Sequence, residues 1–183
     1  AYSWTVSLGS QVIATSTSPG FVFTPSDEGS YSVRLDVNDG DGGTGSVTSV
    51  LGVTNVAPTI TLPNPGPFAE GDTVSFTRPF SDPGADTLVA TWLVTRPDGS
   101  ILPAFVGPDF SYRFEDNGAY TVALTVNDGD GAAPSAQRVF NVANVAPTIL
   151  PLPALTPGEG SLVSLTGLFN DPGSGETYTP SWE

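Results

Sequence analysis

Two short acidic stretches carry the side chains best suited to binding a cation. Asn-Asp-Gly-Asp-Gly occurs at Asn38–Gly42 and again at Asn127–Gly131. Their carboxylate and amide oxygens are the hard ligands that Ca²⁺ prefers, at about six to eight per ion. An EF-hand loop is excluded because it is longer and ends in a bidentate Glu between two helices. A hairpin turn is the second interpretation, since Asp-Gly suits the two positive-φ positions of a type I′ turn, and both interpretations stay open.

Few other side chains of the chain offer chemistry. The 183 residues include no His, no Cys and no Lys, so the usual activated nucleophiles and neutral-pH bases are missing and no enzyme activity is expected. The net charge is −14 and the five arginines are scattered singly, which excludes nucleic acid as a partner. No apolar run approaches the roughly 20 residues of a membrane helix, so no membrane insertion is expected.

The chain repeats itself 89 positions later, which predicts a tandem array. Four segments recur at this one spacing: Gly29–Val37 with Gly118–Val126, Asn38–Gly42 with Asn127–Gly131, Asn55–Ile60 with Asn144–Ile149, and Phe80–Gly84 with Phe169–Gly173.

The phase of the repeat predicts three pieces. Residues 58–146 form a complete unit, residues 1–57 the C-terminal two-thirds of another, and residues 147–183 the N-terminal third of a further one. The two partial pieces complement each other. This is expected from a window cut out of a longer array, or from a protomer that donates strands to a neighbouring copy.

The repeat predicts an all-β fold. Tyr120, Val122, Leu124 and Val126 alternate with small or polar residues, as in a half-buried strand. Further strands are predicted at residues 59–62, 73–77, 88–95, 110–114 and 137–142, punctuated by Gly and Pro. About seven short strands in about 90 residues are typical of an immunoglobulin-like β-sandwich.

Within such a sandwich, the aromatic residues have expected places. Trp4, Trp92 and Trp182 are predicted to lie in the core, and Tyr31 and Tyr120 to form tyrosine corners. The remaining loop carboxylates are predicted to be solvated, because charged residues are rarely buried unpaired. They are Asp27, Glu28, Glu70, Asp72, Glu115, Asp116 and Glu159.

Several segments together resemble the polycystic kidney disease (PKD) repeat in its bacterial form, over essentially the whole chain. They are Asp82–Gly84 (Asp-Pro-Gly), Trp92, Gly118–Val126 (Gly-x-Tyr-x-Val-x-Leu-x-Val) and the Asn-Val-Ala-Pro joint. The resemblance implies an extracellular immunoglobulin-like module of surface proteins, secreted polymer-degrading enzymes or repetitive adhesins, and some members bind a structural calcium. Thr5 and Leu93 stand where the family has the first Asp of Trp-Asp-Phe-Gly-Asp-Gly, which weakens the case for a calcium ligand from that hairpin.

The resemblance also implies a set of calcium ligands. Two groups of oxygens would converge, each at one end of a sandwich: Ser81, Asp82 and Asp128 in the complete unit, with Asp86 and Asp98 as additions, and Asp39, Asn170 and Asp171 in the split unit. In the other interpretation, the Asp of each Asp-Pro-Gly segment only begins a turn. No cofactor other than Ca²⁺ is expected.

Two functions from different classes fit these features. The first is an extracellular structural repeat protein that forms a rod, stalk or filament at the cell surface, with other copies of itself as partners and strand complementation as the means of assembly. The short, proline-restricted joints between units favour a rod. The second is an ancillary binding or adhesion module for a protein, polysaccharide or glycan, with Phe21, Phe105 and Phe110 as candidate surface aromatics.

Overall fold

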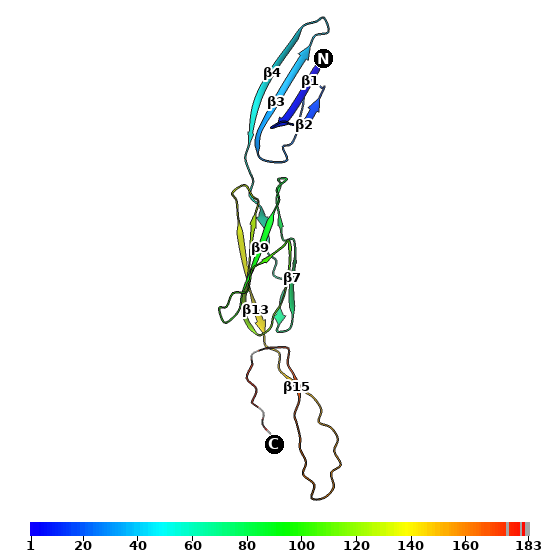
Figure 1. Cartoon of the computed structure of the whole chain (residues 1–183), viewed down its shortest axis with the longest axis vertical. Helices are drawn as coiled ribbons and strands as arrows, with labels where there is room; N and C mark the ends of the chain where they lie inside the picture. Colours follow the sequence, from blue (N-terminus) through cyan, green and yellow to red (C-terminus); the bar gives the residue numbers. More distant parts are fainter. Residues whose placement is uncertain (175, 180, 182–183) are drawn as a thin grey trace. The chain divides into compact units, whose positions relative to one another are not determined.

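The computed structural model describes residues 1–174, 176–179 and 181, and its regular elements are β-strands (Figure 1). This confirms the all-β fold. In the described part of the chain, no helix is long and apolar enough to cross a lipid bilayer. The chain divides into two compact units. Unit 1 contains Ala1–Thr59, Phe80–Val89 and Val126–Pro134, and unit 2 contains Ile60–Pro79, Ala90–Thr125 and Ser135–Glu183.

Unit 1 is built on a four-stranded antiparallel sheet in the order β2-β1-β3-β4. Its strands are β1 (Tyr2–Leu8), β2 (Gln11–Ser16), β3 (Gly29–Asn38) and β4 (Thr44–Val53). The pairing of β3 with β4 runs without a break from Gly29 opposite Val53 to Asn38 opposite Thr44.

The first Asn-Asp-Gly-Asp-Gly stretch closes this β3–β4 hairpin. Gly40 and Gly42 have φ of 92° and 99°, a region that favours glycine. The side chains of Asn38 and Asp39 accept hydrogen bonds from the backbone N–H groups of Gly40 (2.8 Å) and Asp41 (2.9 Å). The letters that suggested a cation loop therefore form a turn, as Asp and Asn commonly do.

A chain of rings lines the sheet of unit 1. Trp4, Phe21, Phe23 and Tyr31 follow one another with centroids 6.2, 6.0 and 6.0 Å apart. The Tyr31 hydroxyl donates to the Asp27 carbonyl at 2.9 Å, four residues upstream, in the manner of a tyrosine corner. Tyr31 is buried, but Trp4 is only half-buried, so its predicted place in the core is not reached.

The middle repeat has two layers. Its larger sheet has the order β10-β9-β12-β13-β6, and β11 pairs with β7 in a separate two-stranded sheet. Most pairs are antiparallel, but β6 joins β13 in parallel. The strands are β6 (Phe68–Ala69), β7 (Thr73–Thr77), β9 (Val89–Thr95), β10 (Phe105–Val106), β11 (Asp109–Arg113), β12 (Gly118–Asn127) and β13 (Ser135–Ala143), and a further pair joins β5 (Thr59–Ile60) to β8 (Phe80–Ser81).

Trp92 on β9 lies at the centre of the core of unit 2, as predicted. It is fully buried between Phe76 of β7 and Phe110 of β11, with ring centroids 5.4 and 4.8 Å apart and nearly parallel planes. Its indole N–H donates to the Gly107 carbonyl at 3.0 Å. Phe110 is thus a core residue and not the surface aromatic that the binding hypothesis suggested, because alternation along β11 turns its ring inward.

Residues 147–179 form little regular structure. β14 (Thr148–Ile149) pairs with β15 (Phe169–Asn170), and the described residues between these strands are exposed. The exposed apolar side chains include Leu162, at 100% exposure, and Val163, Leu165 and Leu168. Trp182 lies outside the described residues, so its predicted core position stays a prediction.

We expect the substitution Trp92→Ala to lower the free energy of unfolding by about 3–5 kcal/mol, because it empties the space between two stacked rings and leaves the Gly107 carbonyl without its donor. Urea denaturation followed by circular dichroism measures this change. The neighbouring substitution Leu93→Ala, on the outward face of β9, is the control and is expected to cost no more than about 1 kcal/mol. Equal effects of the two substitutions would contradict this account of the core.

Candidate metal sites

The ligand set predicted for the complete unit lies in three different settings. Ser81 is exposed on β8, and one oxygen of Asp82 accepts from the Gly84 N–H at 2.6 Å, inside the Asp-Pro-Gly turn. Asp128 is 3% exposed, and its oxygens accept from Asn55 Nδ2 (2.8 Å) and from two backbone N–H groups of its own turn.

These hydrogen bonds stabilise the ionised form of the Asp128 side chain. The hydrogen bond from Asn55 lowers the pKa of Asp128 most, and the turn N–H groups lower it further against the effect of burial. Asp128 therefore has three donors that already stabilise its charge. A calcium site formed by Ser81, Asp82 and Asp128 stays a prediction.

The set predicted for the split unit divides between the two units. Asp39 belongs to unit 1, where one oxygen accepts from the N–H groups of Asp41 and Gly43, both at 2.9 Å. Asn170 and Asp171 belong to unit 2, and Asp171 Oδ1 accepts from the Gly173 N–H at 2.8 Å. The convergence of these three residues also stays a prediction.

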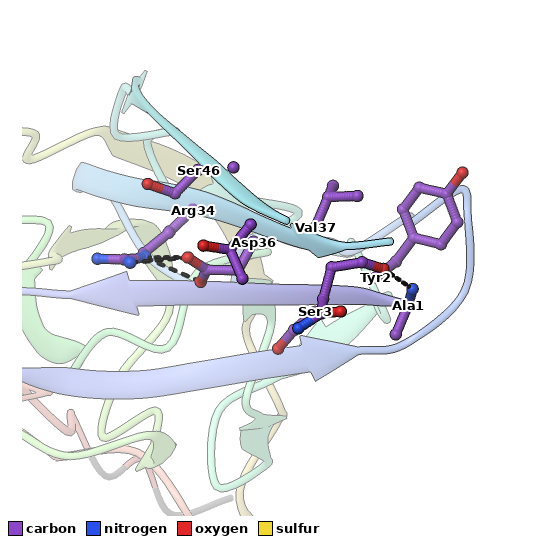
Figure 2. A pocket seen from close by; sticks show the side chains of 10 residues that line it. Ala1, Tyr2, Ser3, Arg34, Asp36, Val37 and Ser46 are labelled. Carbon is purple, nitrogen blue, oxygen red and sulfur yellow. Dashed lines mark hydrogen bonds and ion pairs between the residues drawn. The ribbon is translucent and has the colours of Figure 1, made fainter. Parts of the chain in front are cut away.

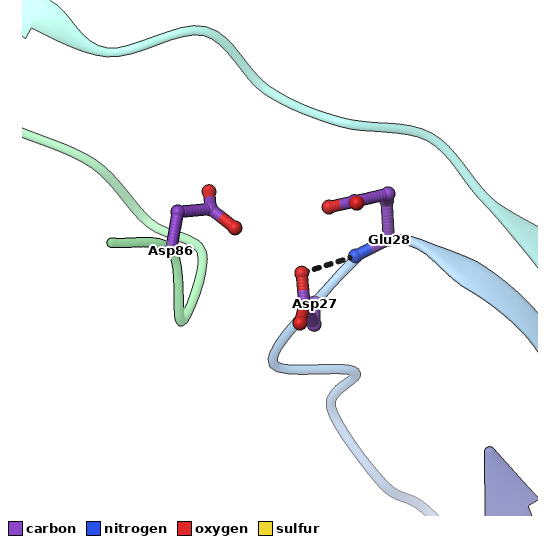
Figure 3. Close-up of side chains that lie close together, drawn as sticks. All are labelled: Asp27, Glu28 and Asp86. Carbon is purple, nitrogen blue, oxygen red and sulfur yellow. Dashed lines mark hydrogen bonds between the residues drawn. The ribbon is translucent and has the colours of Figure 1, made fainter. Parts of the chain in front are cut away.

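One group of acids that the structure brings together lies in unit 1, and we call Asp27, Glu28 and Asp86 the Asp86 cluster. Each offers a carboxylate oxygen within 4.8 Å of the others, and all three side chains are half-buried. Figure 3 shows Asp86, on a loop of its own, facing Asp27 and Glu28. One Asp27 oxygen accepts from the Glu28 N–H at 2.9 Å. The solvated surroundings predicted for Asp27 and Glu28 are therefore only partly found.

Neighbouring acids and burial raise the pKa values of Glu28 and Asp86. The backbone N–H of Glu28 lowers the pKa of its side chain. Hydrogen bonds shared with Asp27 and Asp130, burial and the Asp130 charge outweigh this effect and raise that pKa to about 7. Burial, followed by the charges of Asp27, Asp82 and Asp130, raises the pKa of Asp86 to about 6. A bound proton or a nearby cation would therefore stabilise Glu28 and Asp86 near neutral pH.

The second group lies in unit 2, and we call Glu70, Asp171 and Glu176 the Glu70 cluster. Their carboxylate oxygens also lie within 4.8 Å of one another. Glu70 is 3% exposed, so its predicted solvation is wrong. The reason is the parallel pairing of β6 with β13, which places the residue after β6 beside the end of β13: the Glu70 N–H donates to the Ala143 carbonyl, and Glu70 Oε1 accepts from the Val145 N–H at 2.6 Å.

Of the acids in the Glu70 cluster, only Asp171 belongs to the predicted ligand set. Burial raises the pKa of Glu176, and the negative charges of Asp171, Glu70 and Asp116 add to this effect. The sequence gives no local signal for Glu70 or Glu176, since their approach depends on which strands pair. The repeat itself is a weak signal, because Asp171 and Asp82 are equivalent positions and both lie near a cluster.

A pocket of about 380 Å³ opens at one end of the unit 1 sheet, beside the first strand (Figure 2). Its charged side chains, Arg34 and Asp36, pair with each other at 2.7 Å, and this pairing lowers the pKa of Asp36. Because each neutralises the other, the pocket presents no uncompensated side-chain charge to a ligand.

The Asp86 cluster gives a prediction about pH. The folded state holds the Glu28 proton more tightly than the unfolded chain, whose ordinary pKa is 4.5, so ionisation of Glu28 opposes folding. We therefore expect the melting temperature in the presence of a chelator to fall as the pH rises from about 4.5 to about 7, and Glu28→Gln to reduce that fall.

Thermal unfolding followed by circular dichroism at several pH values measures the effect. Glu159→Gln is the matched control, since Glu159 is exposed and lies outside the cluster. A fall of the same size in the Glu28→Gln chain as in the control would show that the cluster does not carry the pH dependence.

Comparison with known proteins places these features in a family. The model of the PKD domain matches residues 55–143. PKD domains are typically extracellular and generally non-catalytic modules. A search of curated proteins found no match.

Two solved structures were also found to be similar. One is described as "Structures of Clostridium thermocellum CbhA fibronectin(III)-like modules", with 16% identity over 77% of each chain and a TM-score of 0.36. The other is "Crystal structure of Dpr2 Ig1-Ig2 in complex with DIP-Theta Ig1-Ig3", with 17% identity over 81% of this chain and 59% of that one, and a TM-score of 0.36. The domain match is the finding that assigns a family, and it assigns it to one segment: residues 55–143 form a PKD domain.

Proposed function

We propose that the chain is an extracellular structural repeat protein of the cell surface, and that its copies join into a rod, stalk or filament by strand complementation. The observation that carries the proposal is a pair of strand-like segments, residues 20–24 and residues 162–166. Neither forms a strand, and the 89-residue repeat makes them the counterparts of two strands that pair in the complete repeat.

The complete repeat shows how such a pair closes a sandwich. β7 and β11 pair antiparallel, with Phe110 opposite Phe76 and Tyr112 opposite Val74. Val74 and Phe76 are buried, and Phe76 stacks on Trp92. The β7–β11 pair is thus the second layer that covers the central Trp.

Unit 1 contains the counterpart of β11, and none of the described strands pairs with it as β7 pairs with β11. Subtracting 89 from Phe110 and Tyr112 gives Phe21 and Phe23, which line the sheet beside Trp4. The residue between them, Val22, is 92% exposed. An extended segment with free N–H and C=O groups is a template for pairing with another chain.

Residues 162–166 correspond to β7, and no described strand pairs with them. Adding 89 to β7 gives Leu-Val-Ser-Leu-Thr, which matches Thr-Val-Ser-Phe-Thr of β7 at three positions. In the register of the complete repeat, Leu165 would lie opposite Phe21 and Val163 opposite Phe23 of a second copy. Each of these side chains would contribute about 1.5–3 kcal/mol if it moved from full exposure to full burial, and less from its present partial exposure.

The alternative, a binding or adhesion module, has weaker support. Of its three candidate aromatics, Phe110 is buried and Phe21 is half-buried. Phe105 is the exposed one, and its ring leans on Phe110 at 5.9 Å. A single exposed ring is a small platform for a glycan, so we place assembly first.

We expect the chain to form larger species as its concentration rises, and Leu165→Asp to weaken this association by at least about tenfold, because a charge would enter the apolar layer over Trp4. Sedimentation velocity over a concentration series measures the effect. The matched control is Leu155→Asp, since Leu155 is also exposed and corresponds to Gly66 of a loop in the complete repeat. A chain that stays monomeric throughout the series, or equal effects of both substitutions, would contradict strand complementation.

A further inference from the structure

We propose that the Glu70 cluster is a binding site for Ca²⁺, in which Glu70, Asp171 and Glu176 supply the carboxylate oxygens. This site differs from the two ligand sets that the sequence predicted, and it goes beyond the proposed role in assembly. Three observations support it: a buried carboxylate with an unused oxygen, the backbone that orients that oxygen, and the uncompensated charge around it.

The buried carboxylate belongs to Glu70. The residue is 3% exposed, yet its Oε2 atom is buried without a hydrogen-bond partner. Burying an unpaired carboxylate oxygen is costly, and such groups are normally satisfied by a donor or an ion. The Oδ2 atom of Asp171 is buried without a hydrogen-bond partner as well. Two free carboxylate oxygens therefore meet in one place.

The other oxygen of each acid is fixed by the backbone. Glu70 Oε1 accepts from the Val145 N–H at 2.6 Å, and Asp171 Oδ1 accepts from the Gly173 N–H at 2.8 Å. With its side-chain nitrogen turned toward the acids, Asn144 donates to Glu70 Oε1 at 3.1 Å and to Glu176 Oε1 at 2.9 Å. These bonds orient the acids while leaving one oxygen of Glu70 and one of Asp171 free for a ligand.

Gly173 allows the acids to come this close. A Cβ atom at this position would lie 2.8 Å from Glu70 Oε2 and 3.1 Å from Asp171 Oδ1, so a larger residue would displace them. Because Gly173 has no side chain, its backbone can lie against the two carboxylates, as glycine commonly does beside a ligand.

The acids of the Glu70 cluster take part in no ion pair among the described residues, whose ion pairs are Arg34–Asp36 and Arg96–Glu115. Three carboxylates within 4.8 Å of one another repel strongly in a partly buried site, and a divalent cation is the direct remedy.

The chemistry of the donors selects the ion. All three ligands are hard carboxylate oxygens, and the chain has no His or Cys, so Zn²⁺ and softer metals lack their preferred partners. Mg²⁺ demands a nearly ideal octahedron and keeps several of its waters. Ca²⁺ accepts irregular sets of mono- and bidentate carboxylates completed by water, and sites of this kind in extracellular modules bind with a Kd on the order of 10⁻⁴–10⁻³ M.

Within unit 2, such an ion would bridge carboxylates of one repeat and of the segment that follows it. Glu70 belongs to the complete repeat, and Asp171 and Glu176 belong to the segment that follows it. The Ser174 N–H already donates to the Glu115 carbonyl at 2.8 Å between these same two parts. Bound Ca²⁺ would remove the repulsion that opposes this contact.

The test is calcium titration of the full chain, stripped with a chelator, by isothermal calorimetry and by thermal unfolding. We expect uptake of Ca²⁺ and a melting temperature that rises with its concentration. Glu70→Gln keeps the oxygen that accepts from Val145 but removes one negative charge. It is expected to raise the melting temperature without calcium and to weaken calcium binding at least tenfold. Asp171→Asn is expected to weaken binding similarly.

The control is Asp41→Asn, an exposed acid of the β3–β4 turn, whose calcium response should match that of the unmodified chain. No uptake of Ca²⁺, or uptake that survives both Glu70→Gln and Asp171→Asn, would overturn the proposal. Uptake that is lost in Asp86→Asn alone would also overturn it, because the ion would then lie in the Asp86 cluster. The titration is repeated in the Leu165→Asp chain, where an unchanged response separates calcium binding from assembly.

Discussion

The stack of Trp92 between Phe76 and Phe110 is the interaction on which the rest of the repeat depends. It joins the two layers of the sandwich, because Trp92 belongs to the larger sheet while the two phenylalanines belong to β7 and β11. A single sheet cannot bury such a ring on both faces. Unit 1 illustrates the point: among the described rings, Trp4 contacts Phe21, the equivalent of Phe110, at 6.2 Å, and it is half-buried.

Two buried acids show why position in the fold, and not residue type, decides what a carboxylate does. Among the described residues, Glu70 and Asp128 are the buried charged side chains. Asp128 accepts from a side-chain amide and from two N–H groups of its own turn, so its charge is stabilised where it lies. Glu70 uses one oxygen and leaves the other without a donor. The first arrangement is complete without a ligand, whereas the second is not.

The sequence predicted the features that depend on local pattern and on repetition. Period-2 alternation predicted β12 and its copy β3, and the central place of Trp92 followed from its position within a strand. Features that depend on long-range pairing escaped it. The burial of Glu70 requires β6 to join β13 in parallel, and the Asp86 cluster requires the loop of Asp86 to approach Asp27 and Glu28, which lie much earlier in the chain. A two-residue strand such as β6 has too little alternation to reveal its partner. Phe110 was misplaced for the opposite reason, because a five-residue strand has two faces and the sequence did not show which one was covered.

In an array of such repeats, exposed apolar segments would favour association and negative charge would oppose it. In the proposed assembly, complementary strands would bury apolar surface when two chains meet, but each chain brings a net charge of −14. Long-range repulsion between exposed charges is screened beyond about 8 Å at physiological ionic strength, whereas crowded, partly buried carboxylates are screened far less. Salt therefore weakens the repulsion between whole chains, but it has little effect on the repulsion between carboxylates inside each cluster. If the clusters bind cations as proposed, the local concentration of those cations, and not ionic strength alone, would set how firmly successive repeats hold together.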